Sequence, residues 1–135
     1  MLRANLGELP FTDFQDWRAW RRLVPPTAAA IIDQTGSNLI MAQTVTQAAY
    51  WAEITDGLAA ADIEVVHVFL DCDPSILKRR IATDKIEAGA SDWRTSHVDA
   101  FSAARAWLVG DATLTVDTSN LDASSVADQI LAAVA

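Results

Sequence analysis

Apolar residues recur along the chain with two spacings, one typical of helices and one of buried strands. Helical spacing extends over 13–23, 47–61, 74–86, 92–108 and the stretch after Asp122. Short apolar runs predict three strands, over 39–44, 65–70 and 113–116. The run over 65–70 is almost continuously apolar and β-branched, which predicts a strand covered on both faces. Because helices alternate with strands, the sequence predicts an α/β fold with a parallel sheet and helices on both faces.

Local signals mark where several helices begin and end. Thr12 or Asp13 is expected to cap the first helix, and Pro25-Pro26 to interrupt it, because proline lacks an N–H and disfavours helix before it. A helix resuming over 27–34 is expected to stop at Gly36. We expect Asp73 to be the N-cap of the helix that starts at Pro74, and Asp122 to be the N-cap of the last helix.

Composition narrows the class of protein. The chain has 135 residues, which suits a single domain over 1–135, and its 51% hydrophobic content excludes disorder. A formal net charge of −8 disfavours nucleic acid as a partner. The apolar runs are too short to cross a membrane, no secretory signal opens the chain, and the one cysteine, Cys72, fits a reducing compartment. We therefore expect a cytoplasmic protein.

The ends of the predicted strands carry the candidate chemistry, since ligands of parallel sheets gather at the carboxyl edge. These ends are Gln43-Thr44, Asp71-Cys72-Asp73 and Asp117-Thr118-Ser119. Carboxylates there can hold Mg²⁺ or act as a base, although Asp73 is more simply a helix cap. The run over 39–44 contains no acid, and no His/Cys spacing matches a zinc site, so no metal ligand is assigned.

Several motifs share their order and spacing with one known family. They are Asp13–Trp17 with Trp20-Arg21, then Thr44, Tyr50 and Glu53-Ile54, then 65–70 followed by 77–81, then Trp93, Arg94 and His97, and finally Val116-Asp117-Thr118. This pattern, covering roughly 120 residues of one domain-sized unit, resembles P-loop kinase-like ATP-binding proteins of the tunicamycin-resistance type. The resemblance implies a three-layer parallel sheet, ATP and Mg²⁺ as cofactors, and transfer of phosphate to a small-molecule substrate.

The resemblance also implies roles for individual residues. Arg80 and Arg94 match lid arginines that stabilise the transferring phosphate, and Arg105 is expected to take no part. Nucleotide contacts are implied for the remaining candidates, which are Arg79, Thr44, Asp117, Thr118 and Ser119. The simpler alternatives are an ion pair between Arg80 and Asp84 and a solvated Arg94.

Other polar side chains have structural explanations beside the functional ones. His67 and His97 are expected to be packed histidines with satisfied ring nitrogens. The charge-dense stretch at the start of the first helix is either a solvated face or a substrate-side helix. Its charged residues are Asp13, Asp16, Arg18, Arg21 and Arg22.

One motif of the family is not found in the sequence. A phosphate loop needs Gly-x-x-x-x-Gly-Lys-Ser/Thr, and none of the five glycines has that spacing. The resemblance implies that the loop and its strand lie upstream of Met1 in the sequence. In the folded sheet, that strand would lie between the strands at 39–44 and 65–70. We therefore expect weak ATP binding, marginal stability and self-association through unpaired strand edges. The competing interpretation is a non-catalytic fragment or interaction module that binds no nucleotide by itself.

Overall fold

A computed structural model describes residues 13–86 and 88–134, a mixed α/β chain with a small parallel sheet. The chain divides into two compact units, residues 1–65 and 66–135, and each is described by itself. The α/β class is confirmed at this level, and the single domain over 1–135 stays a prediction. No helix in the described part of the chain is both long and apolar enough to span a bilayer.

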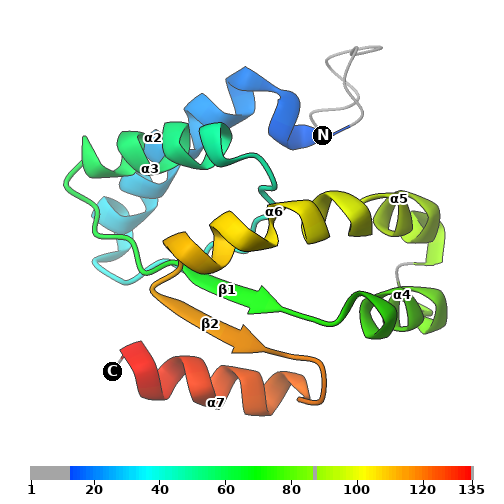
Figure 1. Cartoon of the computed structure of the whole chain (residues 1–135). Coiled ribbons are helices and arrows are strands. Elements are labelled where there is room, and N and C mark those ends of the chain that lie inside the picture. The colour runs from blue at the N-terminus through cyan, green and yellow to red at the C-terminus, as the bar shows by residue number, and fades with distance from the viewer. Residues whose placement is uncertain (1–12, 87, 135) are drawn as a thin grey trace. The chain divides into compact units, whose positions relative to one another are not determined.

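The first unit is built from helices (Figure 1). A short 3-10 helix η1 (Phe14–Asp16) leads into α2 (Arg18–Thr35), and α3 (Ala48–Ala59) packs against α2. Helix α3 confirms the helix predicted over 47–61, and its Ile54 and Leu58 are fully buried as the spacing indicated. The core comprises Ala28, Val45, Ile54 and Leu58, with half-buried Trp20, Val24, Leu39, Tyr50, Trp51, Ile63 and Val65 around it.

Helix α2 corrects the expected break at the two prolines. It runs without interruption through Pro25 and Pro26 and ends at Gly36, whose left-handed backbone (φ 61°) closes it as predicted. A proline inside a helix costs about 3 kcal/mol. Pro25 is nevertheless buried against Gly57 of α3, a tertiary contact that no local rule contains. Asp13, rather than Thr12, which lies outside the described residues, caps the η1 turn by accepting from the Gln15 N–H.

The strand predicted over 39–44 is also wrong. Residues 38–47 have no regular secondary structure, and Ile40 is 95% exposed. Leu39 and Val45 of this segment contribute to the core, and near its end the Thr46 N–H donates to Gln15 Oε1 at 2.9 Å. A strand forms only beside a hydrogen-bonding partner. No described strand pairs with this segment, so its apolar run alone does not make one.

The second unit contains the sheet. Strands β1 (Val68–Asp71) and β2 (Leu114–Asp117) pair in parallel, with Val68 opposite Leu114 and Asp71 opposite Asp117. Parallel pairing is thus confirmed, and β2 matches the predicted 113–116 within one residue. Strand β1 is shorter than 65–70, and Leu70 is 48% exposed, so coverage on both faces is wrong.

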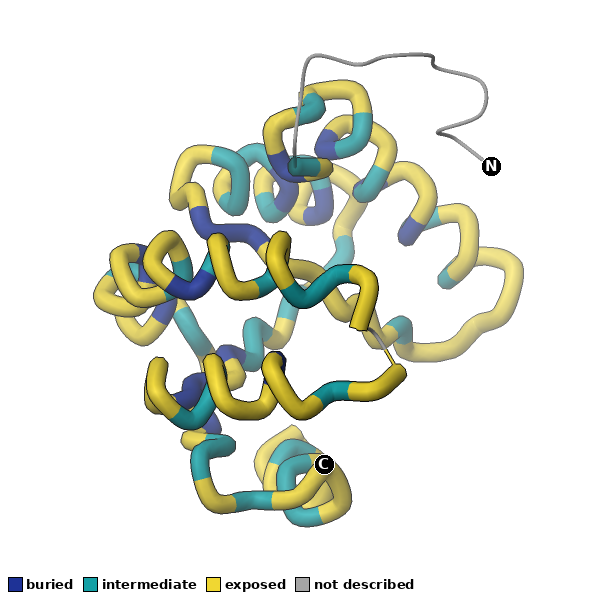
Figure 2. Tube along the Cα trace, turned by 90° about the vertical axis from the view of Figure 1, so that its right-hand side faces the viewer, coloured by how far each residue is buried: buried dark blue, intermediate teal, exposed yellow. Residues whose placement is uncertain are grey.

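Helices α4 (Pro74–Thr83), α5 (Ser91–Ser96), α6 (Val98–Asp111) and α7 (Ala123–Val134), with a 3-10 turn η2 (Ala88–Ala90), complete this unit. Figure 1 shows α6 along one side of the strand pair and α7 along the other. Phe69 of β1 packs with Ala104 and Leu108 of α6, and α7 contacts β2. Helix α7 has no buried residue and remains teal and yellow in Figure 2.

The helix boundaries in the second unit confirm the predicted N-caps, and they show that one predicted helix is too long. Asp73 caps α4 ahead of Pro74, and Asp122 accepts from the Ser125 N–H at the start of α7. The single helix predicted over 92–108 is instead two helices. They meet at His97, whose N–H bonds back to Arg94 and Thr95 and closes α5 before α6 starts.

Candidate functional site

The carboxyl ends of β1 and β2 lie side by side and form the candidate site. The backbone N–H and the hydroxyl of Thr118 both donate to the carbonyl of Asp71, each at 2.9 Å. The Asp73 N–H donates to the hydroxyl of Ser119 at 3.0 Å. Two of the three predicted strand ends, 71–73 and 117–119, are therefore joined by direct hydrogen bonds.

Arg80 connects α4 to the loop that follows β2. Its Nη2 donates to the carbonyls of Thr118 at 2.7 Å, Ser119 at 3.2 Å and Leu121 at 3.4 Å. Its Nη1 lies 3.4 Å from Thr118 Oγ1 and 3.7 Å from the sulfur of Cys72. The structure thus brings Arg80 together with the loop 117–121. The simpler alternative, pairing with Asp84, is not found, because Asp84 pairs with Arg94.

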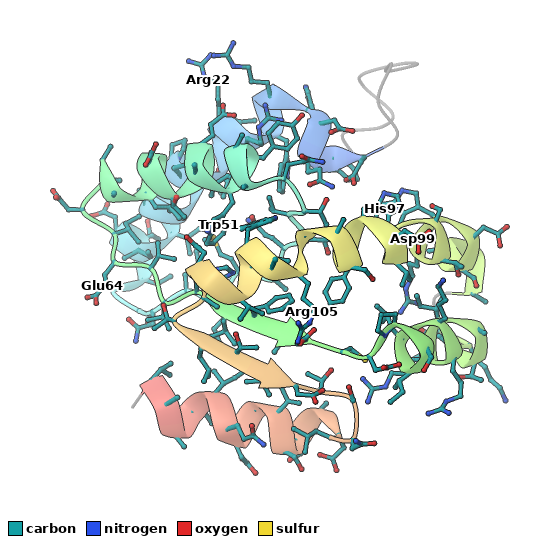
Figure 3. All side chains as sticks on the ribbon, in the orientation of Figure 1. Arg22, Trp51, Glu64, His97, Asp99 and Arg105 are labelled. Carbon is teal, nitrogen blue, oxygen red and sulfur yellow. The ribbon has the colours of Figure 1, made fainter. Side chains whose placement is uncertain are left out.

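Arg105 is the residue that the sequence interpretation missed. From α6 it reaches toward β1 (Figure 3), and its Nε and Nη2 bind Asp71 Oδ2 at 2.9 and 2.6 Å. Asp71 is 7% exposed, so a guanidinium is the partner that its buried charge needs. The pKa of Arg105 is raised, first by this hydrogen bond and then by the charge of Asp71. Arg105 follows Phe101 by four residues and precedes Leu108 by three, which places it on the sheet-facing stripe.

Two acids at the site are held ionised by local hydrogen bonds. The Ser75 hydroxyl, with the Ile76 and Ser75 N–H groups, lowers the pKa of Asp73. The Ser119 hydroxyl and N–H lower the pKa of Asp117. A carboxylate with a lowered pKa is a poor general base at neutral pH. Because Asp73 also fills the N-terminus of α4, those amides are not free to receive a phosphate.

The other candidates do not converge on this edge. Arg94 Nη1 lies 2.7 Å from Asp84 Oδ2, which links α5 to the end of α4. Arg79 is exposed, and its guanidinium has no hydrogen bond or ion pair to any part of the chain that the structure describes. Thr44 is exposed and belongs to the first unit, in the segment that forms no strand.

Both histidines have a hydrogen-bonding partner at one ring nitrogen, which agrees with the prediction that they are packed residues. His67 Nδ1 lies 2.8 Å from Asp111 Oδ2, and His97 Nδ1 lies 2.7 Å from the carbonyl of Trp93. Across residues 13–86 and 88–134, no group of three or more His, Cys, Asp or Glu side chains can hold a metal ion. Mg²⁺ held together with ATP needs only one or two carboxylates beside the phosphates, so Mg²⁺ stays an expectation from the resemblance.

Comparison of the chain with protein-family models, with curated proteins and with solved structures found no match. The case for a function therefore rests on the sequence motifs and on the geometry at the ends of β1 and β2.

Proposed function

We propose that the chain binds ATP at the carboxyl edge of β1 and β2 and belongs to a small-molecule phosphotransferase of the P-loop kinase-like class. The observation that supports this most is the contact between Arg80 and the loop 117–121. The two elements that the resemblance assigns to the nucleotide lie 38 residues apart in sequence. They come together at the edge of the sheet where such folds bind ligands.

The loop supplies the contacts to the base. Its carbonyl oxygens at Ser119 and Leu121 can each accept a second hydrogen bond, from the amino group of an adenine, whereas the N–H groups of Thr118, Ser119 and Leu121 already donate within the chain. The planar guanidinium of Arg80 is anchored by carbonyl oxygens and thereby pre-oriented, so little entropy is lost when a ring stacks on it. Arg94 takes part in phosphate transfer only after it exchanges Asp84 for a phosphate oxygen.

Binding by this chain is expected to be weak. The sequence has no phosphate loop, and the N-terminus of α4 is filled by Asp73. Contacts to the base alone are expected to give a millimolar dissociation constant, which is a binding free energy of about −4 kcal/mol.

Saturation-transfer NMR, which detects weak binding from the ligand signals, tests the proposal. We expect transfer to the adenine protons of ATP in the wild type and its loss in Arg80→Ala. Lys85→Ala is the matched comparison, because it removes an exposed cation next to the end of α4 that has no hydrogen bond or ion pair with the loop 117–121. Equal transfer in all three proteins would show that ATP binds without the contact of Arg80, and no transfer in the wild type would favour the competing interpretation as a module that binds no nucleotide.

A further inference from the structure

A surface hollow in the first unit is lined by none of the residues proposed above to bind the nucleotide. It measures about 400 Å³ and is bordered by α2 and by α3 with the turn after it. Its lining residues are Arg21, Arg22, Pro25, Pro26, Glu53, Gly57, Ala60 and Ala61. This volume is within the range of small-molecule sites, about 300–1,000 Å³.

The two prolines give this hollow an unusual set of acceptors. Proline has no N–H, so the carbonyls of Arg21 and Arg22 lose the donors that stand four residues further along an ordinary helix. Glu53 adds a third acceptor. Its Oε2 binds Arg21 Nε at 2.7 Å, whereas its Oε1 has Arg18 only at 3.9 Å, beyond hydrogen-bond distance. A ligand in the hollow must therefore bring hydrogen-bond donors.

The charges at the hollow decide what kind of donor fits. Arg21 is already engaged, with its side chain 7% exposed, on Glu53, on the Gln15 carbonyl and over the ring of Tyr50. Arg22 extends outward from α2 and has no ion pair within residues 13–86 and 88–134 (Figure 3). Arg21 and Arg22 line the hollow, and Arg18 lies 3.9 Å from Glu53, so the positive charges outnumber the one carboxylate and disfavour an ammonium ligand.

We propose that this hollow binds a neutral polyhydroxylated ring, a sugar or cyclitol. Hydroxyl groups donate to the carbonyls of Arg21 and Arg22 and to Glu53, and they accept from the guanidinium of Arg22. The C–H face of the ring rests on the apolar floor formed by Pro25, Pro26 and the small residues of α3. The site is independent of the nucleotide site proposed above and uses none of its residues.

Titration of the ¹⁵N-labelled full chain with myo-inositol tests the proposal, with inorganic phosphate and putrescine as charged probes. We expect myo-inositol to shift the amide signals of Gly57, Ala60 and Ala61, putrescine to leave them in place, and phosphate, which the arginines attract but Glu53 opposes, to shift them less than myo-inositol does. Larger shifts with phosphate would identify an anion site and overturn the proposal, as would the absence of any shift with myo-inositol.

Two variants separate filling of the hollow from general effects on α3. Ala61→Phe fills the hollow from its exposed rim and is expected to weaken binding of myo-inositol at least about tenfold, or 1.4 kcal/mol. Ala52→Phe places the same ring on an exposed position of α3 outside the hollow and should leave binding unchanged. Equal loss in both variants would contradict the site. A titration with ATP, read at residues 117–121, reports separately on the nucleotide site.

Discussion

The Nη2 atom of Arg80 lies 2.7 Å from the carbonyl oxygen of Thr118, and the hydroxyl of Thr118 donates to the carbonyl of Asp71 at 2.9 Å. Thr118 is therefore held from two sides, by α4 and by the end of β1. The carboxylate of Asp71 is fixed in turn by Arg105 of α6. These contacts make the carboxyl edge of the sheet a connected polar group, and its members can be tested one at a time.

Removal of Arg105 should destabilise the second unit and disturb the loop 117–121. Arg105→Ala leaves the carboxylate of Asp71, 10% exposed as a side chain, without its guanidinium partner. We expect a lower melting temperature and weaker ATP binding, contrary to the expectation from sequence that Arg105 takes no part. Arg105→Lys should restore part of the loss because it keeps the charge. Thermal unfolding compared with Arg79→Ala measures the effect, and equal melting temperatures would show that the ion pair is dispensable.

Gly57→Ala should force α2 and α3 apart. A Cβ at Gly57 would lie 2.6 Å from Cγ of Pro25, and the proline ring cannot rotate away. Overpacking of this kind costs about 1–3 kcal/mol in the free energy of unfolding. The matched control is Gly110→Ala in α6, where no atom lies within 4 Å of the added methyl group. That change should stabilise the helix by about 0.5–1 kcal/mol. Urea unfolding decides, and an unchanged midpoint for Gly57→Ala would contradict this packing.

The contact between Gln15 and Thr46 should contribute measurably to the first unit. Gln15 is 5% exposed and accepts from the Thr46 N–H at 2.9 Å. Gln15→Ala leaves that buried N–H without a partner, which costs about 1–3 kcal/mol. Gln43→Ala, at an exposed position of the same connecting segment, should cost little. A chemical-denaturation series on both variants provides the measurement, and similar midpoints would show that Thr46 finds another acceptor.

Acid should weaken the helix caps at Asp73 and Asp122. Their pKa values are lowered in the folded chain, Asp73 chiefly by the Ser75 hydroxyl and Asp122 chiefly by the Ser125 N–H. A lowered folded pKa gives stability that is present above the unfolded value, about 3.9 for aspartate, and is lost as pH falls through the folded value. We therefore expect the free energy of unfolding to drop below about pH 4.

The double variant Asp73→Asn, Asp122→Asn is the control for this pH dependence. Asparagine keeps the N-cap hydrogen bonds but does not titrate. The acid limb of the stability curve should be shallower in this variant. A curve with the same slope as the wild type would assign the acid loss to other carboxylates.

Short-range signals in the sequence predicted individual helices in both units. Asp73-Pro74 and Asp122 mark helix starts because a cap depends only on the next three residues, and both are confirmed. Helix α3 is equally local, with Ile54 and Leu58 one turn apart and buried. The sequence also predicted that 71–73 and 117–119 lie together, because the carboxyl ends of parallel strands meet at the same edge of a sheet.

Long-range contacts account for what the sequence interpretation did not predict. Whether 39–44 becomes a strand depends on a pairing partner, and the continuity of α2 at Pro25 depends on Gly57 of another helix. Arg105 lies on the stripe of Phe101 and Leu108, a visible signal. An arginine on an apolar stripe suggests a buried acid opposite, but only the fold identifies Asp71 as that acid.

The measurement that tests the nucleotide site most directly is an ATP titration followed by the backbone amide signals of the ¹⁵N-labelled full chain. We expect the amides of 117–121 and those of α4 around Arg80 to shift together, with a dissociation constant in the millimolar range, about −4 kcal/mol. Adenosine should shift the same amides of the loop, because the contacts proposed there are to the base. Shifts confined to other parts of the chain, or no shifts at all, would contradict a nucleotide site at the ends of β1 and β2.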